Sequence, residues 1–119
     1  STFNVTSASY PTSGYAVGGQ VATTHTDAGH LKGDLIQFAS DNQEALQSDA
    51  RNCIGTWKNE STGEIDIDMS TICATEKEAT EIGAPRGEAT IYSLDANKTV
   101  DLQTLSDKYS LDYKKRDDE

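Results

Sequence analysis

The feature that most constrains the fold is an alternation of apolar and acidic residues midway along the chain. Residues 64–69 read Glu-Ile-Asp-Ile-Asp-Met, the period of a strand that has one face in a core and the other in water. Residues 53–57 form the expected partner strand, and residues 59–63 form the turn. A turn of odd length predicts that Trp57 lies opposite Ile65 on the apolar face. The stretch is therefore predicted to be a hairpin at the centre of the core.

The two cysteines, Cys53 and Cys73, bracket this hairpin and are the only ones in the chain. We predict that they form an intramolecular disulfide. In the predicted register Cys53 lies opposite Met69, so a straight strand would carry Cys73 roughly 13 Å beyond it. Bridged cysteines need Cα atoms within about 7 Å of each other. The prediction therefore requires that residues 70–72 turn back towards Cys53.

Length and composition predict a small domain with a thin core. The chain has 119 residues, of which 34% are apolar and 25% are charged, too few apolar side chains for a thick sandwich of helices on a sheet. We expect a mainly β fold, a small antiparallel β-sandwich or barrel with one or two short helices. A single β-rich domain is expected to span residues 1–113, followed by a charged C-terminal tail over residues 114–119.

The remaining elements are predicted from local pattern and turn residues. Capping spacings at Asp41 with Glu44 and at Thr75 with Glu78 predict two short helices, the first over residues 42–51. A turn at residues 11–14 separates the first two expected strands. The expected strands lie near residues 3–5, 15–17, 35–39, 88–94 and 99–105. Residues 109–113 fit either a further strand, which their alternation favours, or a terminal helix.

Charge and sequons bear on the compartment and the partner. The formal net charge is −10, which argues against binding to nucleic acid or to an anionic membrane. The sequence contains no apolar run long enough to insert into a bilayer. Three sequons begin at Asn4, Asn59 and Asn97, where chance gives roughly one. The sequons and the expected disulfide together predict a secreted glycoprotein.

The C-terminal segment contains a dibasic step, Lys115-Arg116. This step resembles the cleavage site of kexin- or furin-type processing proteases, and the alternative is a charged, solubilising tail. In composition, a small acidic domain with a dibasic site is similar to fungal effector and killer-toxin precursors. That similarity implies an effector or toxin component released from a processed precursor.

Two groups of side chains have residue types that bind metal ions. His25, Asp27 and His30 lie close together in a glycine-containing loop, but zinc sites require three or four ligands in tetrahedral array. The acids on the face of residues 64–68 are spaced too widely along one strand to hold a calcium ion together. The sequence therefore predicts no metal and no cofactor, and it contains no nucleophile motif that would identify a catalytic residue.

Aromatic residues give the remaining signal. Trp57, Tyr15 and Tyr92 lie on expected strands and are candidate anchors for a partner, and the alternative is that they line the core. We expect a secreted, non-catalytic domain that binds an extracellular protein or glycan at a cell or host surface. The alternatives are a small secreted hydrolase acting on glycan or RNA, and a structural coat or matrix protein. A hydrolase would show a concave pocket in which acids or histidines converge.

Overall fold

The computed structural model describes residues 2–5, 7 and 9–117 and divides the chain into two compact units. The first unit comprises Ser1–Tyr10 and Val21–Ser70, and the second comprises Pro11–Gln20 and Thr71–Glu119. Each unit has its own cluster of buried apolar side chains.

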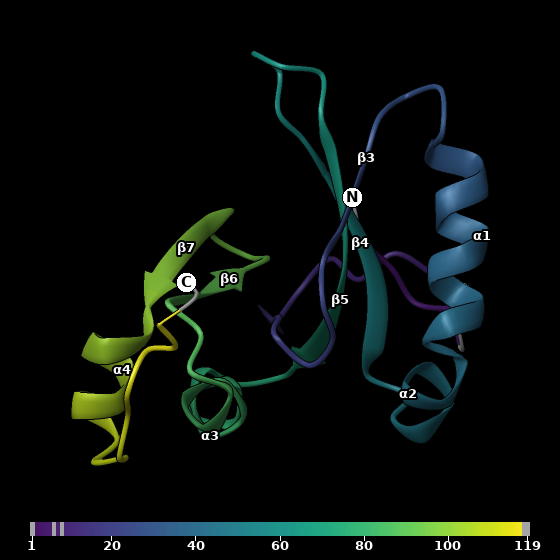
Figure 1. The fold of residues 1–119 in the computed structure, drawn as a ribbon. Coiled ribbons are helices and arrows are strands. Elements are labelled where there is room, and N and C mark those ends of the chain that lie inside the picture. The colour runs from purple at the N-terminus through teal and green to yellow at the C-terminus, as the bar shows by residue number, and fades with distance from the viewer. Residues whose placement is uncertain (1, 6, 8, 118–119) are drawn as a thin grey trace. The chain divides into compact units, whose positions relative to one another are not determined.

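The first unit packs two helices against a group of antiparallel strands. Its strands are β1 (Thr2–Phe3), β3 (Thr24–Thr26), β4 (Asn52–Lys58) and the first part of β5 (Ile65–Cys73), and its helices are α1 (Leu31–Asp41) and α2 (Gln43–Ser48). Strand β5 has β4 and β3 as neighbours, and β1 pairs with β4. Figure 1 shows α1 running alongside these strands. The core here consists of Phe38, Leu46, Ile67 and Met69.

The second unit is built around the end of β5. Its other strands are β2 (Tyr15–Val17), β6 (Thr90–Ser93) and β7 (Lys98–Asp101), and its helices are α3 (Glu76–Arg86) and α4 (Leu102–Lys108). Strand β2 pairs with both β5 and β6, and β7 pairs with β6, in every case antiparallel. The core consists of Val17, Cys73, Ala79, Ile91, Leu102 and Leu105.

The predicted fold class is confirmed in its coarser part. The described strands form one seven-stranded antiparallel sheet, accompanied by four helices. The finer prediction, a sandwich or a barrel, is not confirmed because the sheet is not closed. Helix is also more abundant than the sequence indicated, at 31% of residues against 30% in strands.

Two segments predicted as strands are helical. Residues 35–39 belong to α1, because Leu31, Leu35 and Phe38 recur at helical spacing and contribute to one core. The predicted strand over residues 99–105 stops at Asp101, whose carboxylate accepts a hydrogen bond from the Thr104 amide at 2.9 Å. That contact caps the first turn of α4, so the chain changes from strand to helix there.

The hairpin forms, but its register differs by one residue from the predicted one. The Asn59 amide donates to the Glu64 carbonyl at 2.8 Å, which leaves a four-residue loop over residues 60–63. A slip of one residue moves every side chain of a strand to the other face. Ile54 therefore packs with the Met69 cluster, and Trp57, which was predicted to lie on the apolar face, is 62% exposed.

The predicted disulfide between Cys53 and Cys73 is wrong, because the two sulfurs are not within bonding distance. Residues 70–72 do not turn back. They continue β5, and Thr71 pairs with Val17 of β2. Cys53 neighbours Ile54 on β4 and therefore points to the other face of that strand from the Met69 cluster. Both thiols are buried, and the prediction of secretion loses the support of a disulfide.

We expect that both cysteines carry a thiol in the purified protein. Alkylation after denaturation without reductant should add two alkyl groups to the intact mass. The melting temperature should be the same with and without a reducing agent, because there is no crosslink to remove. Incorporation of no alkyl group, together with a lower melting temperature on reduction, would contradict this structure.

Candidate functional site

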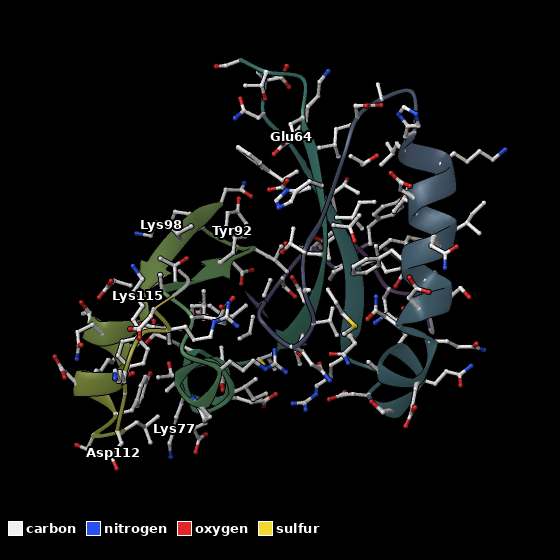
Figure 2. The ribbon with its side chains drawn as sticks, in the orientation of Figure 1. Glu64, Lys77, Tyr92, Lys98, Asp112 and Lys115 are labelled. Atoms are coloured by element: carbon white, nitrogen blue, oxygen red, sulfur yellow. The ribbon has the colours of Figure 1, made fainter. Side chains whose placement is uncertain are left out.

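The candidate site lies at the loop end of the β4–β5 hairpin, on the face turned away from α1. His25 of β3 is directly opposite Asp66 of β5. Counting from the Asn59–Glu64 hydrogen bond places Trp57 opposite Asp66 from the other neighbouring strand. Figure 2 shows Glu64 at the start of β5. We call the side chains of His25, Trp57, Glu64 and Asp66 the hairpin face.

The polar members of the hairpin face are in direct contact. His25 Nδ1 lies 2.6 Å from Asp66 Oδ1 and 3.5 Å from Glu64 Oε1. The side chains of His25 and Glu64 are 64% and 57% exposed, whereas that of Asp66 is 30% exposed. The hydrogen bond to Asp66 raises the pKa of His25, and the negative charges of Asp66 and Glu64 raise it further.

The pH dependence of His25 follows from this direction. Because the pKa of His25 is raised in the folded state, the contact with Asp66 favours folding below the ordinary histidine pKa. The contribution disappears as pH rises through the folded-state value. We expect an NMR titration to give a pKa for His25 above the model-peptide value and to show a lower one in Asp66→Asn. His30 is the internal control, and an unchanged His25 pKa in Asp66→Asn would contradict the contact.

Asp68 continues the acidic row inward along β5 but differs from Glu64 and Asp66 in its surroundings. Its side chain is partly buried. Burial raises the pKa of the Asp68 carboxyl, and the charge of Asp66 raises it further. The three acids predicted from the alternation therefore differ in their contact with solvent. Glu64 and Asp66 can be reached by a partner, whereas Asp68 is less solvated.

The histidine loop, which contains His25, Asp27 and His30, does not bring its two histidines to the same carboxylate. His30 Nδ1 contacts Asp27 Oδ1 at 2.8 Å, whereas His25 turns to Asp66, 41 positions away in sequence. The hairpin face thus combines one member of the histidine loop with two members of the acidic strand. Sequence reasoning treated these groups separately, since no local pattern indicates that β3 pairs with β5.

The three predicted aromatic anchors occupy different environments. Trp57 is largely exposed. Tyr15 packs against the core of the second unit. Tyr92 is 37% exposed, and its hydroxyl donates to Asn97 Oδ1 at 3.3 Å. Figure 2 places Tyr92 near Lys98, on the β6–β7 pair. Of the three, Trp57 has the most accessible ring.

The predicted glycosylation sites differ in how far their side chains are already engaged. The Asn4 amide nitrogen donates to the Ala50 carbonyl at 2.7 Å, so the nitrogen that a glycan would modify is already engaged with the backbone. Asn59 uses its side-chain oxygen to accept from the Ser61 amide within the hairpin loop. Asn97 lies exposed in the turn before β7, with φ of 52°, and is the most accessible of the three.

The C-terminal segment, predicted to be a charged tail that follows the domain, contacts the second unit through Arg116. The Arg116 amide donates to the Gly87 carbonyl at 2.9 Å, and its guanidinium lies 3.3 Å from a Glu88 carboxylate oxygen. Lys115 is exposed. Cleavage at the dibasic step Lys115-Arg116 would therefore require Arg116 to leave these contacts.

Two hollows on the described part of the chain lie elsewhere, beside α2. The larger has a volume of about 500 Å³ and is lined by Gln43, Glu44, Gln47 and Ser48. A second, of about 330 Å³, shares the lining residues Glu44 and Ser48 with the first. Neither is lined by a histidine. His25 and its acids instead lie on the surface of the sheet. The second hollow is lined by two acids, Asp41 and Glu44, without a histidine.

Among the described residues, no helix has both the length and the apolar character needed to cross a membrane. Comparison of the chain with known protein families, with curated proteins and with solved structures gave no match.

Proposed function

We propose that this chain is a non-catalytic binding domain whose hairpin face binds a basic segment of an extracellular protein. The observation that carries the proposal is the position of Trp57, 62% exposed on a strand whose neighbour presents two accessible carboxylates. The extracellular location rests on the three sequons.

The exposure of Trp57 favours an interaction role over a structural one. The core of the first unit is filled by Phe38, Leu46, Ile67 and Met69 without this ring. Tryptophan is among the residues that contribute most to binding energy at interfaces. Because Trp57 lies on a hydrogen-bonded strand, little backbone entropy is lost when a partner covers it.

The charges of the hairpin face determine the kind of partner. Glu64 and Asp66 present carboxylates, and the whole chain carries a net charge of −10. A lysine or arginine of a partner could pair with a carboxylate while its cation lies over the indole ring. Electrostatic attraction would also raise the association rate. A basic peptide segment satisfies both features of the face.

The competing hydrolase function has less support. Its expected mark was a concave pocket with converging acids or histidines. The larger hollow beside α2 is lined by one acid, Glu44, the smaller by two, Asp41 and Glu44, and a histidine lines neither. A glycan partner would also stack on Trp57 but would depend little on the two carboxylates. The two kinds of partner therefore differ in their response to neutralising Glu64 and Asp66.

The proposal is tested by titrating the protein with a lysine- and arginine-rich peptide. Trp57 is the only tryptophan, so its fluorescence reports on this face alone, and calorimetry gives the affinity of variants that lack it. We expect saturable binding that weakens with salt. Trp57→Ala and the double variant Glu64→Gln with Asp66→Asn should each weaken binding by at least about tenfold, a loss of about 1.4 kcal/mol.

Matched controls separate this face from the general acidity of the chain. Glu44→Gln removes a charge beside α2 and should leave the affinity unchanged. Trp57→Ala should keep the melting temperature of the parent, because the ring is exposed. Equal binding by Trp57→Ala would overturn the proposal. The proposal would also be overturned if the protein bound a neutral oligosaccharide instead of the peptide and the double variant Glu64→Gln with Asp66→Asn bound it equally well.

A further inference from the structure

We infer that His25, Glu64 and Asp66 form a binding site for a divalent transition-metal ion such as Zn²⁺. The inference goes beyond the proposed function, because it concerns an inorganic ligand and does not depend on a protein partner. One nitrogen and two carboxylate oxygens, all within 4.8 Å of one another, converge from β3, from β5 and from Glu64, the residue just before β5.

The distances suit a small metal ion. Zinc binds imidazole nitrogen at about 2.0–2.1 Å and carboxylate oxygen at about 2.0–2.2 Å, so two ligands in tetrahedral array are about 3.4 Å apart. His25 Nδ1 and Glu64 Oε1 are already 3.5 Å apart. The 2.6 Å contact between His25 Nδ1 and Asp66 Oδ1 would have to widen by less than about 1 Å to admit the ion. The exposed imidazole can rotate to allow this.

The backbone holds the ligands in place. His25 and Asp66 are paired residues of an antiparallel ladder, and the pairs on either side, Thr24 with Ile67 and Thr26 with Ile65, fix the register. Ile65 and Ile67 are buried and anchor β5. Directly opposed side chains have Cβ atoms about 5 Å apart. Three ligands on this frame would leave the fourth position of a tetrahedral ion for water or another ligand.

The donor set also selects among metals. Calcium takes six to eight oxygen ligands, and this site offers carboxylates from two residues only, so weak calcium binding is expected. Imidazole nitrogen with carboxylate oxygen suits zinc, cobalt and nickel. The chain contains a matched comparison in His30 and Asp27, an exposed pair at a similar distance, 2.8 Å. Among the described residues, however, only His25 of the two histidines belongs to a group of three possible ligands whose atoms all lie within 4.8 Å of one another.

The test is calorimetric titration of the metal-free protein with ZnCl₂, together with Co²⁺ absorption as a report of coordination. We expect one ion per chain. His25→Ala and the double variant Glu64→Gln with Asp66→Asn should each weaken binding by at least about tenfold. The control variant His30→Ala with Asp27→Asn should bind like the parent, and CaCl₂ should not compete. Circular dichroism checks that each variant is folded.

Two results would overturn the inference. One is no zinc binding by the parent protein, and the other is equal binding by His25→Ala. Because the titration contains no peptide, its failure is separable from failure of the proposed function. Peptide binding in the presence of EDTA with no zinc binding would overturn the metal site alone. If the protein binds zinc but does not bind basic peptides, the proposed function alone would be overturned.

Discussion

Replacing Gly14 with alanine is expected to destabilise the second unit by about 3 kcal/mol or more. Gly14 has φ of +91°, a conformation that side chains other than glycine rarely adopt. A Cβ at this position would also lie 2.5 Å from the backbone carbonyl oxygen of Cys73. Because that oxygen belongs to the sheet, it cannot move aside as a flexible side chain would. Urea unfolding should show the loss as a lower midpoint.

Alanine substitutions at two other glycines separate the two causes of the expected destabilisation, the positive φ angle and the close contact of the added Cβ. Gly63 has φ of +76° but nothing within 4 Å of the added carbon, so Gly63→Ala should cost only about 1–2 kcal/mol. Gly33, inside α1, also faces empty space, and Gly33→Ala should stabilise that helix by up to about 1 kcal/mol. If Gly14→Ala were no worse than Gly63→Ala, the close approach to Cys73 would be wrong.

Arg86→Met is expected to cost about 2–4 kcal/mol. Its guanidinium donates to the Val17 and Gly18 carbonyls at 3.2 and 3.1 Å and to Thr71 Oγ1 at 3.0 Å. Thr71 is 1% exposed, so water cannot readily replace the lost donor. Methionine keeps most of the volume of the stem but removes the donor of these three hydrogen bonds, and chemical denaturation measures the difference.

Arg51→Met is the matched control for this loss. Arg51 pairs with Asp49 at 2.8 Å, but its side chain is 45% exposed. Exposed ion pairs contribute little, so the expected change is below about 1 kcal/mol. Equal effects of Arg86→Met and Arg51→Met would show that Arg86 does not organise the second unit as the structure indicates.

Local signals in the sequence predicted several elements correctly. The capping spacing at Thr75 is confirmed, because Thr75 Oγ1 accepts from the Glu78 amide at 3.2 Å at the start of α3. The alternation of residues 64–69 corresponds to the first part of β5. Tyr15–Val17 is a strand as predicted. These signals were sufficient because caps and strand alternation depend on residues only a few positions apart.

Features that depend on partners far along the chain could not be predicted in this way. The face on which Trp57 lies depends on whether the hairpin loop has an odd or even number of residues, and one hydrogen bond from Asn59 decides it. The apolar residues 35–39 fit either a strand or a helix, and packing against Leu46, Ile67 and Met69 favoured the helix.

The candidate site was missed for the same reason. Its histidine and its carboxylates were each noticed, but in separate groups. They meet only because β3 pairs with β5 across 41 positions of sequence. Contacts of this kind are set by tertiary topology, and neither composition nor spacing reports them.

The register of the β4–β5 hairpin is the central claim, because it brings Trp57 to the same face as His25, Glu64 and Asp66. Cross-strand NOEs between backbone protons of labelled protein test it most directly. The structure predicts that Trp57 lies opposite Asp66 and Ile54 opposite Met69. NOEs that instead pair Trp57 with Ile65 would return the ring to the apolar face and would contradict both the hairpin face and the function proposed for it.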